Sequence, residues 1–561
     1  MARYSAYLET ADDGMCMAHV AELPGCFVRA PEQEAALRLL PMAIVDYYDW
    51  LRRHGEPAPL PAEPVEVEVA GESPGWGPFD PGDTAALFPP DREPITLEEM
   101  ERYFRLMAHN RTDLLALVQE PTDDLLDWRP DPEAYNLRRV LRHIGNADQW
   151  YVSRIVPPET LPAEWEEDED LPPFEFLEMA RRTAVAWLRR LTEEERSGVF
   201  YPTVWTKHPE EPWTARKVLR RTLEHEREHT EQAREILAAR RRWLLARLAA
   251  ERARLLMQVL GLDEQTLTGV IVAGDWTVKD LLAHQGAWDR WQANVMASLV
   301  RGEIPDLSAL DDFDVSNAAF VAERRQWSLK EVIAELQAAR ADWVSWLEDL
   351  TEEEFFQPRS FNEYDWCFDG GPLRVQWEHD ADHAGEIAAW RRSEGLKQGT
   401  GPKAVLSAVL AAAREELLAA AVLVPSEARA SRPVCGEWTV KDLIGHIADW
   451  ECFGAEGLRL MAAGRTPDVE PIDDFDTWNA AHAEARREQS WDTVVSDLHA
   501  ARRALAGAVE EIGEAALTQS FPFPWGGKGT PYQWICVYVG HDREHAHDLQ
   551  VAVGLDAYGL T

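Results

Sequence analysis

Three sets of histidines recur along this chain at closely matched intervals. In each set a single histidine is followed, further along the chain, by a pair of histidines four residues apart. The sets are His143 with His225 and His229, His284 with His379 and His383, and His446 with His541 and His545. Two residues four apart lie on one face of a helix, where a histidine from a neighbouring helix can join them around one ion. The sequence therefore predicts three metal sites in three copies of one domain.

Apolar periodicity places these histidines on helices. From Thr96 onward the spacing predicts four helices in each copy, with the single histidine on the second helix and the pair on the fourth. The predicted helices are 97–119, 137–155, 173–192 and 215–240, then 244–260, 278–301, 329–350 and 373–393, and finally 403–422, 440–463, 491–512 and 532–552. The predicted fold is mainly α, with three tandem up-down four-helix bundles at 95–242, 243–397 and 398–561.

The second and third copies are visibly related. GDWTVKDLL at 274–282 matches GEWTVKDLI at 436–444, and DDFD at 311–314 recurs at 473–476 with the same offset. A period this long indicates domain duplication rather than a solenoid of short repeats. The threonine of each WTVKD segment has an aspartate three residues later, which predicts an N-cap at the start of the second helix. We expect these two bundles to pack as an intramolecular pseudo-dimer.

Residues 1–56 follow a different pattern. RYSAYLET, MCMAHVAEL and CFVRA read as three short strands separated by turn residues, and helical spacing runs from Glu32 to about His54. This predicts a small α+β module of the βββα type. Residues 57–94 are rich in proline and glycine, which indicates a linker or an ordered irregular arm. The segment VEVEVA within this linker could add one strand.

Charge and hydropathy exclude several classes of partner. The formal net charge is −42, which argues against nucleic acid and against an anionic membrane surface. No apolar run reaches the roughly 18 residues of a membrane helix. The start of the chain lacks the apolar core of a signal peptide, so a cytoplasmic location is expected. The six cysteines include no CxxC pair and fall outside the histidine motifs, so thiolate ligands are not indicated.

The chemistry of the ligands narrows the kind of metal site. All three pairs have the form H-acid-x-acid-H, namely HEREH, HDADH and HDREH. Neutral imidazoles suit zinc first, with nickel or ferrous iron as alternatives. Three protein ligands leave positions open for water or substrate, which is typical of a catalytic rather than a structural zinc site. A bound water would then be acidified toward neutral pKa.

Acidic residues beside these histidines are candidates for acid–base or orienting roles. The acid just before the last histidine of each set is Glu228, Asp382 or Glu544. It could orient a ligand or act as a general base, and the competing interpretation is a solvated acid on the helix surface. An acid five residues after each single histidine also recurs, at a less favourable angle: Asp148, Asp289 and Glu451.

Two further patterns have competing interpretations. Trp288 and Trp450 each follow the single histidine by four residues, so they could wall a pocket beside the metal or pack in the core. The pairs in the first and third copies also match the H-x-x-E-H pattern of certain metalloproteases. That pattern explains neither the recurring third histidine nor the Asp382 variant.

These motifs carry a resemblance to a known family. Across roughly residues 95–561 the chain resembles the DinB/YfiT-like superfamily of metal-binding four-helix bundles. The segments that carry it are LRRVLRHIGNADQW, WTVKDLLAHQGAWD, WTVKDLIGHIADWE and the three H-acid-x-acid-H motifs. The resemblance implies a divalent metal held by the triad. It also implies activities such as thiol-dependent transfer or isomerisation, with a low-molecular-weight thiol as cofactor, and hydrolysis of reactive small molecules.

The N-terminal module resembles a second family. YSAYLETADDG, the ELPGC turn and the helix from Glu32 to His54 are similar to the HicB-like antitoxin fold. The DNA-binding segment that usually follows that fold is not evident here, so the resemblance implies an interaction or sensor module with a protein partner.

Two functional hypotheses follow. The first is a divalent-metal-dependent hydrolase or thiol-transferase-like enzyme acting on small, toxic or electrophilic molecules. The alternative is a non-catalytic metal- or ligand-binding interaction protein whose HicB-like module recruits a partner.

Overall fold

The computed structural model describes residues 2–58, 64–74, 86–157, 160, 171–202, 204–361, 364–470, 472 and 474–554. The chain divides into two compact units, Met1–Leu237 and Ala238–Thr561. The protein is mainly α, with a small N-terminal sheet domain and three helical bundles, as predicted. No helix among the described residues is long and apolar enough to cross a membrane.

The N-terminal module is a four-stranded sheet with one helix packed on it. The strands are β1 (Ala2–Thr10), β2 (Cys16–Val20), β3 (Phe27–Ala30) and β4 (Val65–Pro74), in the order β3-β2-β1-β4. Helix α1 (Gln33–Arg53) buries Leu40, Ile44 and Tyr47. Because β4 pairs in parallel with β1, the VEVEVA segment is a strand of this sheet. Part of the stretch predicted as a linker therefore belongs to the module.

The first bundle follows the predicted helix order. It consists of the 3-10 helix η1 (Pro89–Arg92), α2 (Leu97–Leu117), α3 (Asp123–Asp127), α4 (Leu137–Val152), α5 (Pro173–Leu188), α6 (Glu193–Ser197) and the beginning of α7 (Ala215–Val259). The module and this bundle share one buried core, to which Tyr47, Leu106 and Leu223 all belong. Gly25 of the module lies so close to α7 that a Cβ there would stand 3.3 Å from Leu223 Cβ.

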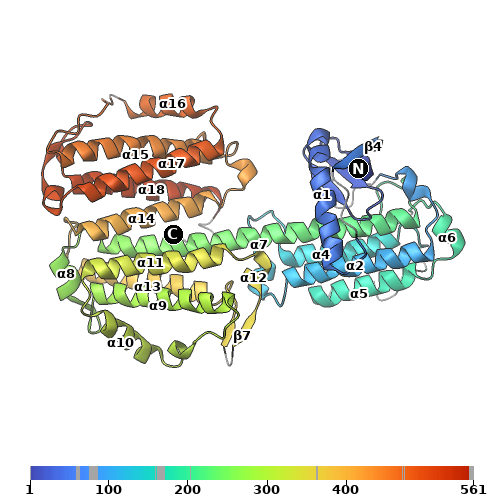
Figure 1. Cartoon of the computed structure of the whole chain (residues 1–561), viewed down its shortest axis with the longest axis horizontal. Helices are drawn as coiled ribbons and strands as arrows, with labels where there is room; N and C mark the ends of the chain where they lie inside the picture. Colours follow the sequence, from blue (N-terminus) through green and yellow to red (C-terminus); the bar gives the residue numbers. More distant parts are fainter. Residues whose placement is uncertain are drawn as a thin grey trace. The chain divides into compact units, whose positions relative to one another are not determined.

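The second and third bundles repeat the same arrangement (Figure 1). The second contains the end of α7, then α8 (Glu264–Gly269), α9 (Val278–Val300), α11 (Leu329–Glu348), α12 (Glu352–Phe356) and α13 (Pro372–Ser393). The third contains α14 (Lys403–Ala421), α15 (Val440–Ala462), α17 (Trp491–Glu511) and α18 (Pro531–Ala552). Both predicted N-caps are confirmed, because Thr277 and Thr439 each form a capping box with the aspartate three residues on.

Short elements connect these helices. Four are two-stranded hairpins: β5 (Ile271–Ala273) with β6 (Trp276–Thr277), β7 (Arg359–Phe361) with β8 (Tyr364–Trp366), β9 (Pro433–Cys435) with β10 (Trp438–Thr439), and β11 (Phe521–Pro522) with β12 (Lys528–Gly529). Three are 3-10 helices: η4 (Ser308–Leu310), η5 (Ser426–Ala428) and η6 (Glu514–Thr518). Two longer helices were not predicted, α10 (Phe313–Arg324) and α16 (Phe475–Arg486). Each begins at an aspartate N-cap in the repeated DDFD segment, Asp312 or Asp474.

One predicted boundary is wrong. The sequence pattern separates 215–240 from 244–260, whereas the structure has the single helix α7 across both. The residues around that boundary, AARRRWLLA from 238 to 246, contain no glycine, proline or N-cap residue that would end a helix. Residues with high helix propensity therefore continue α7 through this boundary, although the apolar residues move to a different side of the helix there.

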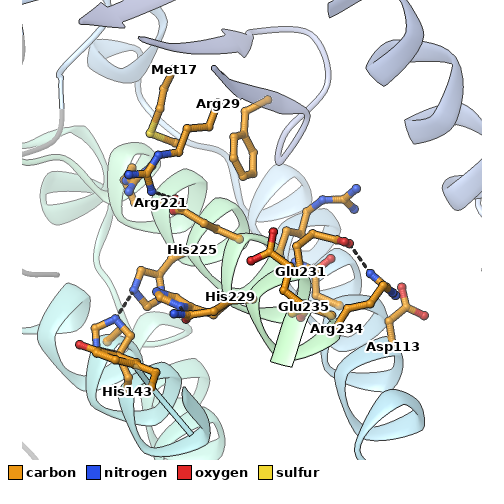
Figure 2. Close-up of a pocket in the computed structure, with 18 of the residues that line it drawn as sticks. Met17, Arg29, Asp113, His143, Arg221, His225, His229, Glu231, Arg234 and Glu235 are labelled. Atoms are coloured by element: carbon orange, nitrogen blue, oxygen red, sulfur yellow. Dashed lines mark hydrogen bonds and ion pairs between the residues drawn. The ribbon is translucent and has the colours of Figure 1, made fainter. Parts of the chain in front are cut away.

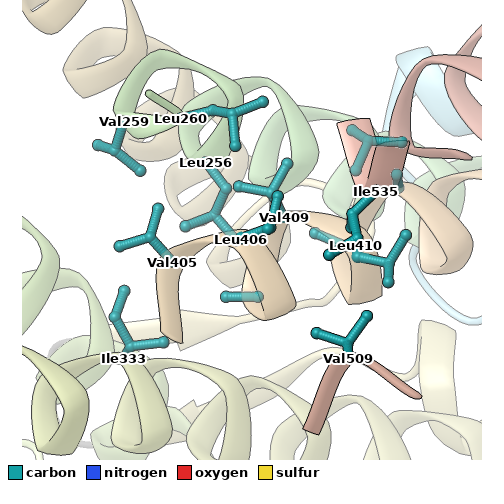
Figure 3. Packing of buried hydrophobic residues seen from close by; sticks show 14 of the residues in the cluster. Leu256, Val259, Leu260, Ile333, Val405, Leu406, Val409, Leu410, Val509 and Ile535 are labelled. Atoms are coloured by element: carbon teal, nitrogen blue, oxygen red, sulfur yellow. The ribbon is translucent and has the colours of Figure 1, made fainter. Parts of the chain in front are cut away.

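The second and third bundles share a hydrophobic core. Figure 3 shows Leu256 and Val259 of α7 beside Leu406 and Val409 of α14, and all four are at most 1% exposed. Residues of α11, α17 and α18 belong to the same buried cluster. The intramolecular pseudo-dimer of these two bundles stays a prediction, and this buried cluster would form its interface.

Candidate metal centres

The structure brings the members of each predicted histidine set together. In every set, one ligand atom from each histidine lies within 4.8 Å of the others. The Nε2 atoms of the single histidine and of the first pair member are 2.9 Å apart for His143 and His225, 2.7 Å for His284 and His379, and 2.9 Å for His446 and His541. The last histidine completes the group, with Nε2 of His383 3.0 Å from His379 Nε2 and Nε2 of His545 3.1 Å from His541 Nε2.

Helix positions explain this convergence. The single histidines lie on α4, α9 and α15, and the pairs on α7, α13 and α18, so each site is formed between the second and fourth helices of a bundle. The N-caps Thr277 and Thr439 fix where α9 and α15 begin. Their histidines follow seven residues later, about two turns down the helix.

A hydrogen bond orients the last histidine of each set. Its Nδ1 lies 2.7 Å from Gln232 Oε1 in the first bundle, 2.8 Å from Glu386 Oε2 in the second and 3.0 Å from Asp548 Oδ2 in the third. Each partner is three residues further along the helix. An acceptor at Nδ1 favours the tautomer in which Nδ1 carries the proton and Nε2 keeps its lone pair for a metal.

The residues present fit a divalent metal. Zinc–nitrogen bonds of about 2.0–2.1 Å place two tetrahedral ligands roughly 3.3 Å apart. The Nε2 separations of 2.7–3.1 Å therefore need to open by only a few tenths of an ångström. In addition, Nε2 atoms that face one another cannot all be satisfied by hydrogen bonds between neutral imidazoles, because a donor is needed for every acceptor.

Burial keeps the imidazoles neutral. Desolvation, reinforced by the neighbouring histidines, lowers the pKa of His143, His379 and His541 to about 4, and of His284 and His446 to about 2. Neutral imidazole is the form that binds a metal. At pH 7 these five imidazoles are therefore already in the form that binds a metal.

These shifts predict a pH dependence for the metal-free protein. A histidine in the unfolded chain has a pKa near 6.5. Between about pH 6.5 and 4 the unfolded chain therefore binds protons at these histidines, whereas the folded protein does not. The stability that neutral histidines contribute is present above pH 6.5 and is lost as the pH falls through this window. The melting temperature of chelator-treated protein should fall from about pH 7 to 4.5. A variant with His379→Gln and His383→Gln should show a shallower fall, and an identical pH profile would contradict the prediction.

The candidate acids beside the last histidines lie in different surroundings. Glu228 accepts a hydrogen bond from Arg29 Nη1 at 2.6 Å, whereas Asp382 and Glu544 are exposed. Their acid–base role stays a prediction.

The acid that directly follows the first histidine of each pair is buried in a network of ion pairs, which the sequence did not predict. In the second bundle Arg252 and Arg340 lie between Asp289 and Asp380, with four ion pairs of 2.8–3.0 Å. All four side chains are at most 6% exposed. Each comes from a different helix, so the quartet ties α7, α9, α11 and α13 together. Asp380 directly follows His379, a candidate metal ligand, so the quartet and the candidate site are adjacent along α13.

The same quartet recurs in the other bundles. Its members are Arg111, Asp148, Arg181 and Glu226 in the first bundle, and Arg414, Glu451, Arg502 and Asp542 in the third. One member is the acid five residues after the single histidine, which the sequence had singled out. The arginines could have been found in the second and third copies, because they recur with the offset that relates the WTVKD segments.

Aromatic side chains surround the second and third sites. The ring of Trp276 lies 5.0 Å from that of His284, and Trp438 lies 4.8 Å from His446. Trp288 Nε1 donates to Asn317 on α10 at 2.8 Å, and Trp450 Nε1 donates to Asn479 on α16 at 3.0 Å. The two unpredicted helices are thereby fixed over the second helix of their bundles, next to the single histidine.

Helical bundles with an open three-histidine cluster between their second and fourth helices define a class of metal-binding four-helix proteins. The DinB superfamily model matches residues 106–233, 247–387 and 410–549. The chain therefore belongs to the DinB superfamily, in three tandem copies, and its triads are compatible with the metal binding general in that superfamily. Searches of curated proteins and of solved structures found no match.

Proposed function

We propose that each bundle holds one divalent metal ion, zinc in the first instance, on its three histidines and acts there on a small molecule. The observation that carries this proposal is the convergence of the Nε2 atoms, together with the acceptor that orients the last histidine of each set. When bound, such an ion supplies Lewis-acid chemistry and an acidified water. Hydrolysis or thiol transfer on an electrophilic substrate is the proposed reaction class.

The chain's own residues would divide the work. His284, His379 and His383 hold the ion in the second bundle, and Glu386 orients His383 through Nδ1. The buried quartet positions the helices that carry these ligands. Asp382, on the exposed face beside His383, is the proposed proton acceptor, and its place at the solvent edge lets it exchange that proton with water.

A second candidate is a non-catalytic metal- or ligand-binding protein. The exposure of Asp382 and Glu544 favours it, because a general base is usually held by a partner. In this version the N-terminal module, which we propose to be HicB-like, recruits a partner protein.

A substrate screen separates the two candidates. Ester, amide and thiol-conjugation substrates are offered to the full chain with zinc restored, with and without a low-molecular-weight thiol. We expect turnover that falls when His379 and His383 are both replaced by alanine, and that is lost when the histidine pairs of all three bundles are replaced. His499→Ala is the matched control, because His499 is exposed and lies outside the triads. Turnover that survives simultaneous replacement of all three histidine pairs would contradict an enzymatic metal site, and a screen without turnover would favour the binding protein.

A further inference from the structure

The first histidine site opens into a cavity of about 1220 Å³ that the N-terminal module helps to enclose. His143, His225 and His229 line one part of it, and Met17 and Arg29 of the module line another. Figure 2 shows Met17 and Arg29 projecting from the sheet toward α7, on the side where Arg221 and His225 lie. The cavity is large enough for an organic molecule that reaches from the triad to the module.

Specific contacts fix the module as a wall of this cavity. Arg29 pairs with Glu228 of α7 at 2.6 Å, and the buried His19 contacts Glu224 of α7 through Nδ1 at 2.9 Å. On the other side, Trp50 Nε1 donates to Asp113 of α2 at 2.6 Å. Together with the shared hydrophobic core, these contacts make the module part of the site's architecture.

Arg221 places a cation beside the triad. It precedes His225 by four residues and therefore lies on the same face of α7. Its Nη1 donates to Glu224 at 2.9 Å, and the Tyr151 hydroxyl is a second hydrogen-bond partner of the guanidinium. A guanidinium has five N–H donors, so Arg221 retains capacity to bind an oxyanion.

Several other charges on the cavity wall have protein partners. Asp113 accepts from Trp50 and contacts His54, and Glu231 pairs with Arg234 at 2.5 Å. Arg227 lies over the Trp50 ring, 4.5 Å from its centroid. Arg221, beside the triad and with an unused donor, is the wall residue best placed to receive an anion from a ligand.

The second and third sites have different walls. At the position of Arg221 they carry Val375 and Val537, which are 59% and 49% exposed. At the position of Ala147, four residues after the single histidine, they carry Trp288 and Trp450. Beside its triad the first site thus has an arginine and a small alanine, where the other two sites have valine and tryptophan.

We propose that the first histidine site selects an organic anion, with Arg221 holding its carboxylate and Arg29 of the N-terminal module supporting it from the opposite wall. The apolar body of the ligand would lie against Met17 and Phe27, which line the same cavity. This inference rests on the proposed function in one respect: both place the ligand beside the histidine triad.

Calorimetry with a matched pair of probes tests the proposal. Octanoate and its neutral isostere octanamide are titrated into the full chain, with zinc and after chelation. Octanoate is expected to bind at one arginine-dependent site per chain and more tightly than octanamide. Arg221→Gln should weaken octanoate at least about tenfold, and Arg221→Lys should restore part of the loss. Arg234→Gln, which changes a cavity arginine already paired with Glu231, is the control and should bind octanoate like the wild type.

Several results would overturn the proposal. They are failure of octanoate to bind at millimolar concentration, equal binding of the two probes, and unchanged octanoate affinity in Arg221→Gln. Arg29 lies on the wall formed by the module, and its side chain is 38% exposed. Arg29→Gln therefore tests whether a cavity arginine contributes to octanoate binding without disturbing a buried residue. If chelated protein still binds octanoate more tightly than octanamide, the anion site is upheld even if the metal proposal fails. Failure of the anion proposal and failure of the metal proposal are therefore distinguishable.

Discussion

Replacing Asp380 by alanine should destabilise the second bundle by about 3–5 kcal/mol, because it removes one of two anions from a buried network and leaves Arg252 and Arg340 sharing the single carboxylate of Asp289. Asp380 is fully buried and accepts from both Arg252 and Arg340. Removing one anion from such a network costs far more than the intact ion pairs contributed, because one buried positive charge is left without compensation. The same reasoning applies to Glu226 and Asp542 in the other bundles.

Asp382 provides the matched control for this experiment. It lies two residues away on α13 but is exposed, so Asp382→Ala should change stability by no more than about 0.5 kcal/mol. Hydrogen exchange of the α13 amides under native conditions reports the stability of this bundle separately from the others. Equal protection in the two variants would show that the quartet does not hold the bundle together.

Much of the fold could be predicted because the bundles are amphipathic and capped. The predicted helix at 278–301 corresponds to α9 (Val278–Val300), whose start Thr277 fixes through its capping box. Helix α10 was missed because its apolar residues cover another helix instead of forming a core stripe. Phe313 and Phe320 both pack on Trp288. The parallel pairing of β4 with β1 could not be read locally, because it joins segments more than 50 residues apart.

The candidate site could be predicted to a similar degree. The identical i, i+4 spacing located the three histidine pairs, because the helix period alone places such a pair on one face, and a preceding histidine in each copy completed the sets. The acceptors Gln232, Glu386 and Asp548 were missed because they differ in residue type between copies. The wall that Arg29 contributes to the first site depends on how a sheet packs against α7, which no local pattern encodes.

Zinc should stabilise each bundle through its triad. A ligand present at about 1,000 times its dissociation constant stabilises the state that binds it by roughly 4 kcal/mol. In the third bundle this should appear as slower hydrogen exchange in α18 after zinc is added. A variant with His541→Ala and His545→Ala should lose the effect, because both ligands from α18 are gone.

His547 is the control for that variant. It is exposed on the same helix and has no counterpart in the other copies, so His547→Ala should keep the full response to zinc. Protection of α18 that responds to zinc without His541 and His545 would place the ion elsewhere.

The metal content of the full chain tests the central claim most directly. After zinc loading and desalting, elemental analysis should give about three ions per chain, one for each open three-histidine site. The double variant His284→Ala, His446→Ala, which removes the single histidine from two bundles, should retain about one ion. Three ions bound by that variant would contradict the assignment of the triads as metal centres.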